Sequence, residues 1–291
     1  MGTSTPFGGP GNGTPLVPDF VDDDTAPPNP DPASQDDDPE KDDADRPPKA
    51  PAPKPKPVPP PVPDRFRGAR VAFTKFASSG GSDRKALGRA VSRYVSTASG
   101  GSTSATRRMG SSRGTAARFA SFLGDVANRG IQAALATLNL SGLVGRPATE
   151  ILSALVESFC PEGGSIDEGI ARDAFMETVV DLADAGITDL GSLTPAQIQT
   201  MLELYVAHTI EDRIYNDIGV RGVEVPSDVK SAEAVRDQLH DFMLGGVADA
   251  FAAADLDFTA INPAIINQTI ETLYESSFDM LEALGEDEAQ K

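Results

Sequence analysis

Apolar residues recur at three- and four-residue spacing through most of the chain after residue 130, a pattern typical of amphipathic helices. The best specified of these helices begins at Ser165 and Glu168, which have the S-x-x-E spacing of a capping box, and Gly186 suits its end. Its predicted buried face consists of Ile170, Ala171, Ala174, Phe175, Thr178, Val179 and Leu182. This face must pack against other elements.

The same pattern predicts further helices on both sides. Thr194 and Gln197 form a second capping box with Pro195 at the first helical position, and Asn262-Pro263 begins the last helix. Other predicted helices are Pro147–Phe159, a helix over Ile198–Ile214 with apolar residues at a spacing of four, and a helix over Val235–Phe251. No alternating run is long enough for a sheet, so we expect an all-α fold.

Residues 1–64 have a different composition. They hold 19 of the 24 prolines and two runs of aspartate, Asp22–Asp24 and Asp36–Asp38, but few large apolar residues. Such a segment cannot bury enough apolar surface to offset chain entropy, which predicts a long disordered Pro/Asp-rich arm. Pro51–Pro63 favours a stiff polyproline II spacer; a proline-rich ligand for a partner domain is the alternative.

Charge divides the chain into three parts. Residues 1–64 carry a net charge of −8, residues 65–129 carry +11, and residues 130–291 carry −22, which together give −19. We therefore expect an arm and tether over 1–64, a basic helical segment over 65–129, an acidic α-helical domain over 130–285 and a disordered tail over 286–291.

The basic segment has two interpretations. Arg107, Arg108 and Arg113 form a compact cluster before Phe119 and Phe122, which could contact nucleic acid or a phosphate. Alternatively, the segment packs against the acidic domain, and the phenylalanines belong to the core because they have helical spacing. No recognisable binding motif accompanies the charge, which favours packing.

Catalytic and metal-binding groups are few. The two histidines and Cys160 have no metal-ligand spacing, so no metal site is predicted, and His208 with Glu211 and Asp212 is interpreted as an exposed helix turn. A stripe of carboxylates is interpreted as a solvated helix face: Asp173, Glu177, Asp181 and Asp184. With no catalytic residue and no cofactor site predicted, we expect a protein that is not an enzyme.

The chain contains no apolar run of transmembrane length, and its N-terminus lacks the basic and apolar regions of a secretory signal. The one cysteine excludes an intramolecular disulfide and suggests a reducing compartment. These features predict a cytoplasmic protein.

Five motifs carry a family resemblance. They are Met1–Ser4, Pro15–Pro18, Arg107–Arg113, Cys160–Arg172 and Asn216–Gly219. In combination they resemble the QatB family, a component of the bacterial Qat anti-phage defence system. The resemblance implies an accessory protein of immunity whose partners are an ATPase (QatA), a QueC-like enzyme (QatC) and a TatD-like nuclease (QatD).

The resemblance also suggests a role for the N-terminus. QueC-type enzymes activate a deazaguanine carboxylate with ATP for attack by ammonia, and a protein amine in its place would form an amide. Gly2 offers the least hindered such amine after removal of Met1, and residues 2–20 contain no lysine. The expected modification site is therefore Gly2, and the expected partner-binding residues are Thr3, Ser4, Phe7, Leu16, Val17 and Phe20. The alternatives are a nucleic-acid-binding adaptor that uses residues 65–129 and an enzyme with unrecognised carboxylate chemistry.

Overall fold

A computed structural model describes residues 64–160, 164–219, 226, 228–257 and 264–291. The chain divides into two units, Met1–Pro59 and Pro60–Lys291, and every described residue belongs to the second unit. Except for Asp64, the predicted disordered arm lies outside the described residues.

The described residues form helices and turns, with no strand among them, which confirms the all-α fold. The α-helices are α1 (Arg67–Ser78), α2 (Arg84–Arg93), α3 (Ser102–Arg107), α4 (Gly110–Arg129), α5 (Ile131–Thr137), α6 (Ala148–Phe159), α7 (Ile166–Asp184), α8 (Pro195–Ile214), α9 (Val229–Ala254) and α10 (Ile266–Gln290). The short 3-10 turns are η3 (Ser141–Leu143) and η4 (Leu190–Ser192), and the π-helical turns are η2 (Tyr94–Ala98) and η5 (Tyr215–Gly219).

The predicted helix starts are confirmed at α7 and α8. The Ser165 hydroxyl accepts a hydrogen bond from the Glu168 amide, and the Glu168 carboxylate accepts one from the Ser165 amide. Thr194 and Gln197 form the same reciprocal pair before α8, with Pro195 in its first turn. These bonds satisfy amides that have no partner within the helix.

One continuous core joins the basic and acidic parts of the sequence. Phe73, Leu87 and Phe119 of the basic segment belong to the same buried cluster as Tyr205 and Phe278 of the acidic helices. Aromatic rings connect α4, α7 and α8, because the Phe175 ring lies 4.9 Å from that of Phe119 and 5.8 Å from that of Tyr205. The two segments of opposite charge therefore stabilise each other through a shared apolar core.

The C-terminal helix corrects the expectation of a disordered tail over 286–291. Helix α10 continues to Gln290, and Glu288 near its end forms an ion pair with Arg84 of α2 at 3.2 Å. Gly285, within this helix, lies against Gly88 of α2. The predicted start of this helix, Asn262-Pro263, lies outside the described residues.

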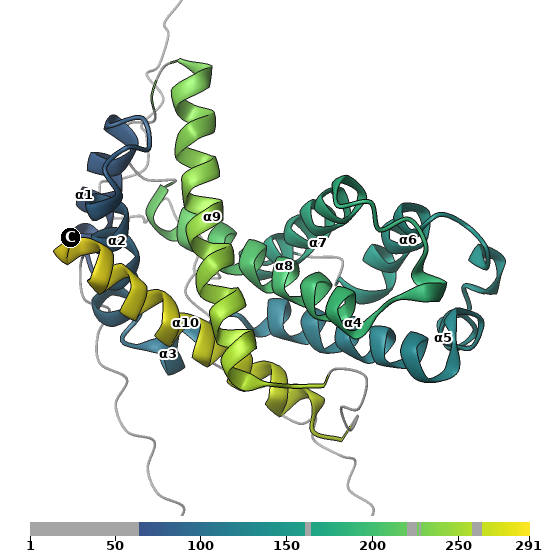
Figure 1. Cartoon of the computed structure of the whole chain (residues 1–291). Coiled ribbons are helices and arrows are strands. Elements are labelled where there is room, and N and C mark those ends of the chain that lie inside the picture. The colour runs from purple at the N-terminus through teal and green to yellow at the C-terminus, as the bar shows by residue number, and fades with distance from the viewer. Residues whose placement is uncertain (1–63, 161–163, 220–225, 227, 258–263) are drawn as a thin grey trace, which may run out of the picture. The chain divides into compact units, whose positions relative to one another are not determined.

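Helix α9 packs against both α8 and α10, and more lightly against α1. Figure 1 shows it as a long helix with α1 and α2 on one side and α7 and α8 on the other, while the C-terminus at the end of α10 lies beside α1 and α2. Helix α8 packs against both α7 and α9, and side chains of these three helices form the site described below.

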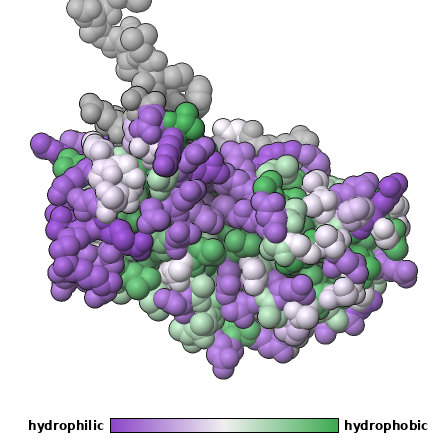
Figure 2. All heavy atoms as spheres, turned by 45° about the horizontal axis from the view of Figure 1, so that its top comes forward, coloured by the Kyte–Doolittle hydropathy of each residue, from purple (hydrophilic) through white to green (hydrophobic). Residues whose placement is uncertain are grey.

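None of the helices in the described part of the chain has the length and apolarity needed to cross a membrane. The face seen in Figure 2 is mostly hydrophilic, with hydrophobic side chains in small groups. Exposed hydrophobic residues in single positions are ordinary for a folded domain.

Candidate functional site

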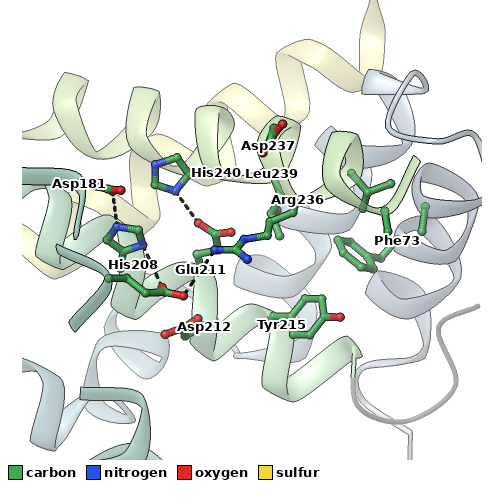
Figure 3. A pocket seen from close by; sticks show the side chains of 14 residues that line it. Phe73, Asp181, His208, Glu211, Asp212, Tyr215, Arg236, Asp237, Leu239 and His240 are labelled. Carbon is green, nitrogen blue, oxygen red and sulfur yellow. Dashed lines mark hydrogen bonds and ion pairs between the residues drawn. The ribbon is translucent and has the colours of Figure 1, made fainter. Parts of the chain in front are cut away.

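A cavity of about 500 Å³ opens between α7, α8, α9 and α1. Its two ends differ in chemistry. Phe73, Tyr215 and Leu239 line one end, whereas the other end gathers histidine and carboxylate side chains (Figure 3). The polar end consists of Glu177, Asp181, His208, Glu211, Asp212 and His240.

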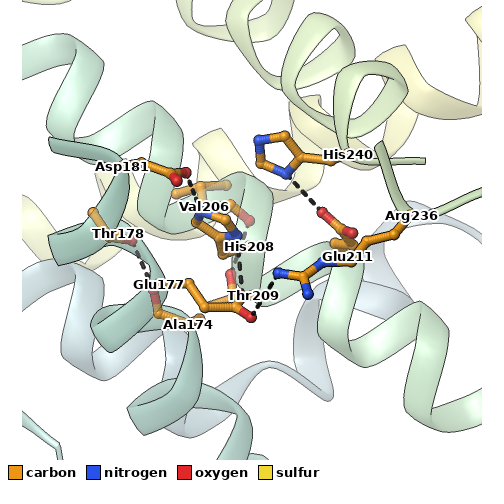
Figure 4. A network of polar contacts seen from close by, with 10 residues as sticks. All are labelled: Ala174, Glu177, Thr178, Asp181, Val206, His208, Thr209, Glu211, Arg236 and His240. Carbon is orange, nitrogen blue, oxygen red and sulfur yellow. Dashed lines mark hydrogen bonds and ion pairs between the residues drawn. The ribbon is translucent and has the colours of Figure 1, made fainter. Parts of the chain in front are cut away.

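His208 lies at the centre of the polar end. Its side chain comes from α8, is only 6% exposed, and contacts carboxylates of α7 with both ring nitrogens. Nδ1 lies 3.2 Å from Oε2 of Glu177, and Nε2 lies 2.7 Å from Oδ2 of Asp181 (Figure 4). A neutral imidazole can donate through only one nitrogen, and an ionised carboxylate only accepts. Both contacts are therefore satisfied only when a second proton or another cation is present at the ring.

The two carboxylates favour the protonated form of the His208 ring. Burial alone would lower the pKa of His208, but the hydrogen bonds to Glu177 and Asp181, together with their charges, outweigh burial and raise it. The pKa of Glu177 is correspondingly lowered, chiefly by its hydrogen bond to His208.

His240 extends the cluster from α9. Its ring stacks on the His208 ring, with centroids 4.9 Å apart and an interplanar angle of 28°. Its Nδ1 lies 2.9 Å from Oε2 of Glu211, and this hydrogen bond is the main reason that the pKa of His240 is raised. Glu211 therefore fixes the orientation of the His240 ring.

Asp212 adds a buried carboxylate. Its Oδ2 is buried and has no hydrogen-bond partner among the described residues. Burial, reinforced by the charges of Glu177 and Glu211, raises the pKa of Asp212 to about 7. The surrounding side chains therefore do not fully neutralise the carboxylates at the polar end of the cavity.

A cation is the ligand class that this arrangement suits. Five carboxylates line the cavity: Glu177, Asp181, Glu211, Asp212 and Asp237. Arg236 also lines it, but its side chain is 75% exposed and reaches Glu177 only at 3.8 Å. One ligand atom each from Asp181, His208 and His240 lie within 4.8 Å of one another. Concentrated negative charge at a partly enclosed site attracts cations.

This cluster corrects two interpretations of the sequence. His208 is buried rather than part of an exposed turn, and Glu177 and Asp181 face the cavity while Asp173 and Asp184 are exposed. Burial of His208 follows from its place in a continuous buried stretch of α8, where its neighbours include Leu204, Tyr205, Val206 and Ala207. A helical stretch that is mostly apolar on all sides is typically buried, and the sequence around His208 has this character. The meeting with His240 depends on how α8 packs against α9, which spacing along one helix does not reveal.

The residues singled out at the N-terminus lie outside the described residues: Gly2, Thr3, Ser4, Phe7, Leu16, Val17 and Phe20. Of the three arginines considered for nucleic acid, Arg107 is exposed. Arg108 lies 3.9 Å from Asp217, and Arg113 lies 3.2 Å from Glu271. The structure therefore directs Arg108 and Arg113 toward acidic residues of the same domain.

Comparison with known proteins identifies a family. The family model described as Qat anti-phage system associated protein QatB matches residues 100–281, which include helices α3 to α9 and most of α10. Neither the curated proteins nor the solved structures include a significant match. Because the matched region covers more than half of the chain, this chain belongs to the QatB family of the Qat anti-phage defence system.

Proposed function

We propose that this chain is a non-catalytic component of anti-phage defence that docks on the QueC-like enzyme QatC and presents its Gly2 amine for modification with a deazaguanine. The observation that carries the proposal is membership of the QatB family, together with the lysine-free segment from Gly2 to Phe20. In this role the helical domain is the docking module and the N-terminal segment is the substrate. QatA and QatD act as further partners in the cytoplasm.

The proposed reaction is formation of an amide. The deazaguanine carboxylate attacks ATP, which gives an acyl adenylate and releases pyrophosphate. The neutral Gly2 amine then attacks the acyl carbon, a C–N bond forms, the C–O bond to AMP breaks, and the nitrogen loses a proton. An α-amino group has a pKa of about 8 against about 10.4 for lysine, so its neutral, nucleophilic fraction at pH 7 is over about 100-fold larger.

The helical domain supports the proposal because a folded domain with its own core can dock on a partner enzyme. Its described helices share one buried core, which runs from α1 to α10. The chain from Phe20 to Asp64 is 45 residues long. Fully extended, it spans up to about 150 Å, so a docked domain does not limit the reach of the amine into an active site.

The test is the intact mass of the full chain, with sequencing of its N-terminal peptide, after co-expression with QatC. We expect a mass increase equal to the deazaguanine acid minus one water, located on Gly2, and no increase when the QatC active site is disabled. An unmodified Gly2 alongside the active enzyme would refute the proposal.

Two variants at position 2 separate the amine from the rest of the arm. Gly2→Glu keeps the initiator methionine, because a large second residue prevents its removal, and should abolish the modification. Gly2→Ala still allows removal of the methionine and should be modified. Equal modification of both variants would place the reaction elsewhere on the chain.

The alternative, a nucleic-acid-binding adaptor that uses residues 65–129, remains a prediction. The ion pairs of Arg108 and Arg113 reduce the charge that this segment offers to phosphates. No observation on the described residues favours it over the docking role.

A further inference from the structure

We propose that Asp181, His208 and His240 bind one divalent transition-metal ion at the polar end of the cavity between α7, α8 and α9. The ion would join three helices that approach from different parts of the sequence. This site is independent of the proposed modification of Gly2.

The histidines are oriented for this role by other carboxylates. Glu177 holds Nδ1 of His208 at 3.2 Å, and Glu211 holds Nδ1 of His240 at 2.9 Å. In metal sites a carboxylate commonly accepts a hydrogen bond from one histidine nitrogen and thereby directs the other nitrogen at the metal. Here the same arrangement occurs twice, and it leaves Nε2 of each ring for the ion.

The distances suit a small ion. Nε2 of His208 lies 2.7 Å from Oδ2 of Asp181, and ligand atoms of all three residues lie within 4.8 Å of one another. Metal bonds of about 2.0–2.2 Å in tetrahedral geometry place ligand atoms about 3.3–3.6 Å apart. The measured separation is shorter than this value and the 4.8 Å limit exceeds it, so binding of an ion requires the side chains to adjust.

A metal ion can take the place of the second ring proton of His208. With the ion bound by Nε2 and by Asp181, the remaining nitrogen of a neutral ring can donate to Glu177, and both carboxylates stay ionised. The buried Oδ2 of Asp212, which has no hydrogen-bond partner among the described residues, lines the same cavity. It can accept from a water bound to the ion.

The donor set indicates the class of metal. Two imidazole nitrogens and one carboxylate oxygen suit Zn²⁺ and neighbouring transition metals, whereas Mg²⁺ and Ca²⁺ prefer oxygen ligands alone. Three protein ligands leave a fourth position toward the cavity, where a water can bind.

The binding test uses the full chain, stripped of metal by a chelator and dialysed, and titrated with Zn²⁺ in competition with a chromogenic chelator. We expect one equivalent of Zn²⁺ bound per chain. His240→Gln should lower the affinity at least tenfold by removing a ligand. Glu211→Ala should lower it by about 10- to 100-fold by removing the oxygen that orients the His240 ring. The control Asp184→Asn, at an exposed position of the same helix as Asp181, should leave the affinity unchanged.

Two measurements guard against misfolded variants. Circular dichroism should give the same helical spectrum for all variants, and Co²⁺ bound to the unaltered chain should show visible absorption bands typical of a nitrogen- and oxygen-ligated site. Absence of stoichiometric Zn²⁺ binding by the unaltered chain, or equal affinity in His240→Gln and Asp184→Asn, would overturn the proposal.

Discussion

His208 shows how one buried polar side chain connects two helices. It lies on α8, is 6% exposed, and bridges Glu177 and Asp181 on successive turns of α7. These carboxylates are themselves 40% and 35% exposed, so water screens part of their charge. The contribution of His208 to folding therefore comes from packing and hydrogen bonding as well as from charge.

Replacing His208 tests this contribution. In the presence of a chelator, which removes any metal, His208→Ala should lower the free energy of unfolding by about 2–3 kcal/mol, because two hydrogen bonds and a buried ring are lost. Urea unfolding followed by circular dichroism measures the change. Thr200→Ala on the exposed face of the same helix should change stability by less than about 0.5 kcal/mol. Equal effects of the two substitutions would contradict the role of His208.

At the scale of the element, capping side chains fix the residue at which a helix begins. Asp83 caps α2 by accepting a hydrogen bond from the Ala86 amide at 2.9 Å, and Asp228 caps α9 through the Ser231 amide at 2.8 Å. The bond to the Ala86 amide is the main reason that the pKa of Asp83 is lowered. A depressed pKa means that the ionised form stabilises the folded chain, and this stability is lost as pH falls through the folded-state value.

The cap of α2 gives a prediction with a defined pH dependence. At pH 7, Asp83→Ala should destabilise the chain by about 1 kcal/mol, because an orphan amide loses its acceptor. The difference from the unaltered chain should shrink at pH values below about 3.9, where Asp83 becomes protonated in the unfolded and then in the folded state. Asp83→Asn retains a capping oxygen and should lose less stability at pH 7. Urea unfolding at several pH values measures these differences, and a constant difference for Asp83→Ala would contradict the prediction.

Close packing of α2 against α10 depends on two glycines. A Cβ atom added at Gly88 would lie 2.6 Å from the carbonyl oxygen of Gly285, and one added at Gly285 would lie 2.7 Å from the carbonyl oxygen of Gly88. Backbone atoms cannot move aside as a flexible side chain can. The two helices therefore approach at a distance that only glycine permits.

Replacing Gly88, with Gly169 as a control, separates the effect of close helix packing on stability from the effect of helix propensity. Gly88→Ala should destabilise the chain by about 1–3 kcal/mol, since the helices must move apart. Gly169→Ala in α7, where an added Cβ meets no atom within 4 Å, should instead be neutral or stabilising by up to about 1 kcal/mol. Thermal unfolding of both variants provides the comparison. A gain in stability for Gly88→Ala would show that α2 and α10 are not in close contact.

At the scale of the whole molecule, local sequence signals and tertiary packing explain different features. The capping boxes at Ser165 and Thr194 are local patterns, and α7 and α8 begin where these patterns predict. The extension of α10 beyond Gly285 depends on Gly88 and Arg84, which lie about 200 residues earlier in the chain. Spacing along the C-terminal segment alone could not reveal it.

The candidate site was missed for the same reason. His208 and His240 are 32 residues apart and fit no ligand spacing, yet packing of α8 against α9 stacks their rings. Asp181 joins them from α7, where its position within a regular carboxylate stripe resembles a solvated face. The site therefore becomes visible only when three helix faces are brought together.

The most direct test of the proposed role is the mass of the N-terminal peptide from the full chain purified in complex with QatC. If the helical domain docks while the N-terminal segment is the substrate, Gly2 should carry the deazaguanine in the complex with active QatC. The Gly2→Glu variant should remain bound to QatC without carrying the modification. An unmodified Gly2 in the complex with active enzyme would contradict the substrate role, and loss of QatC from the Gly2→Glu variant would contradict docking through the helical domain.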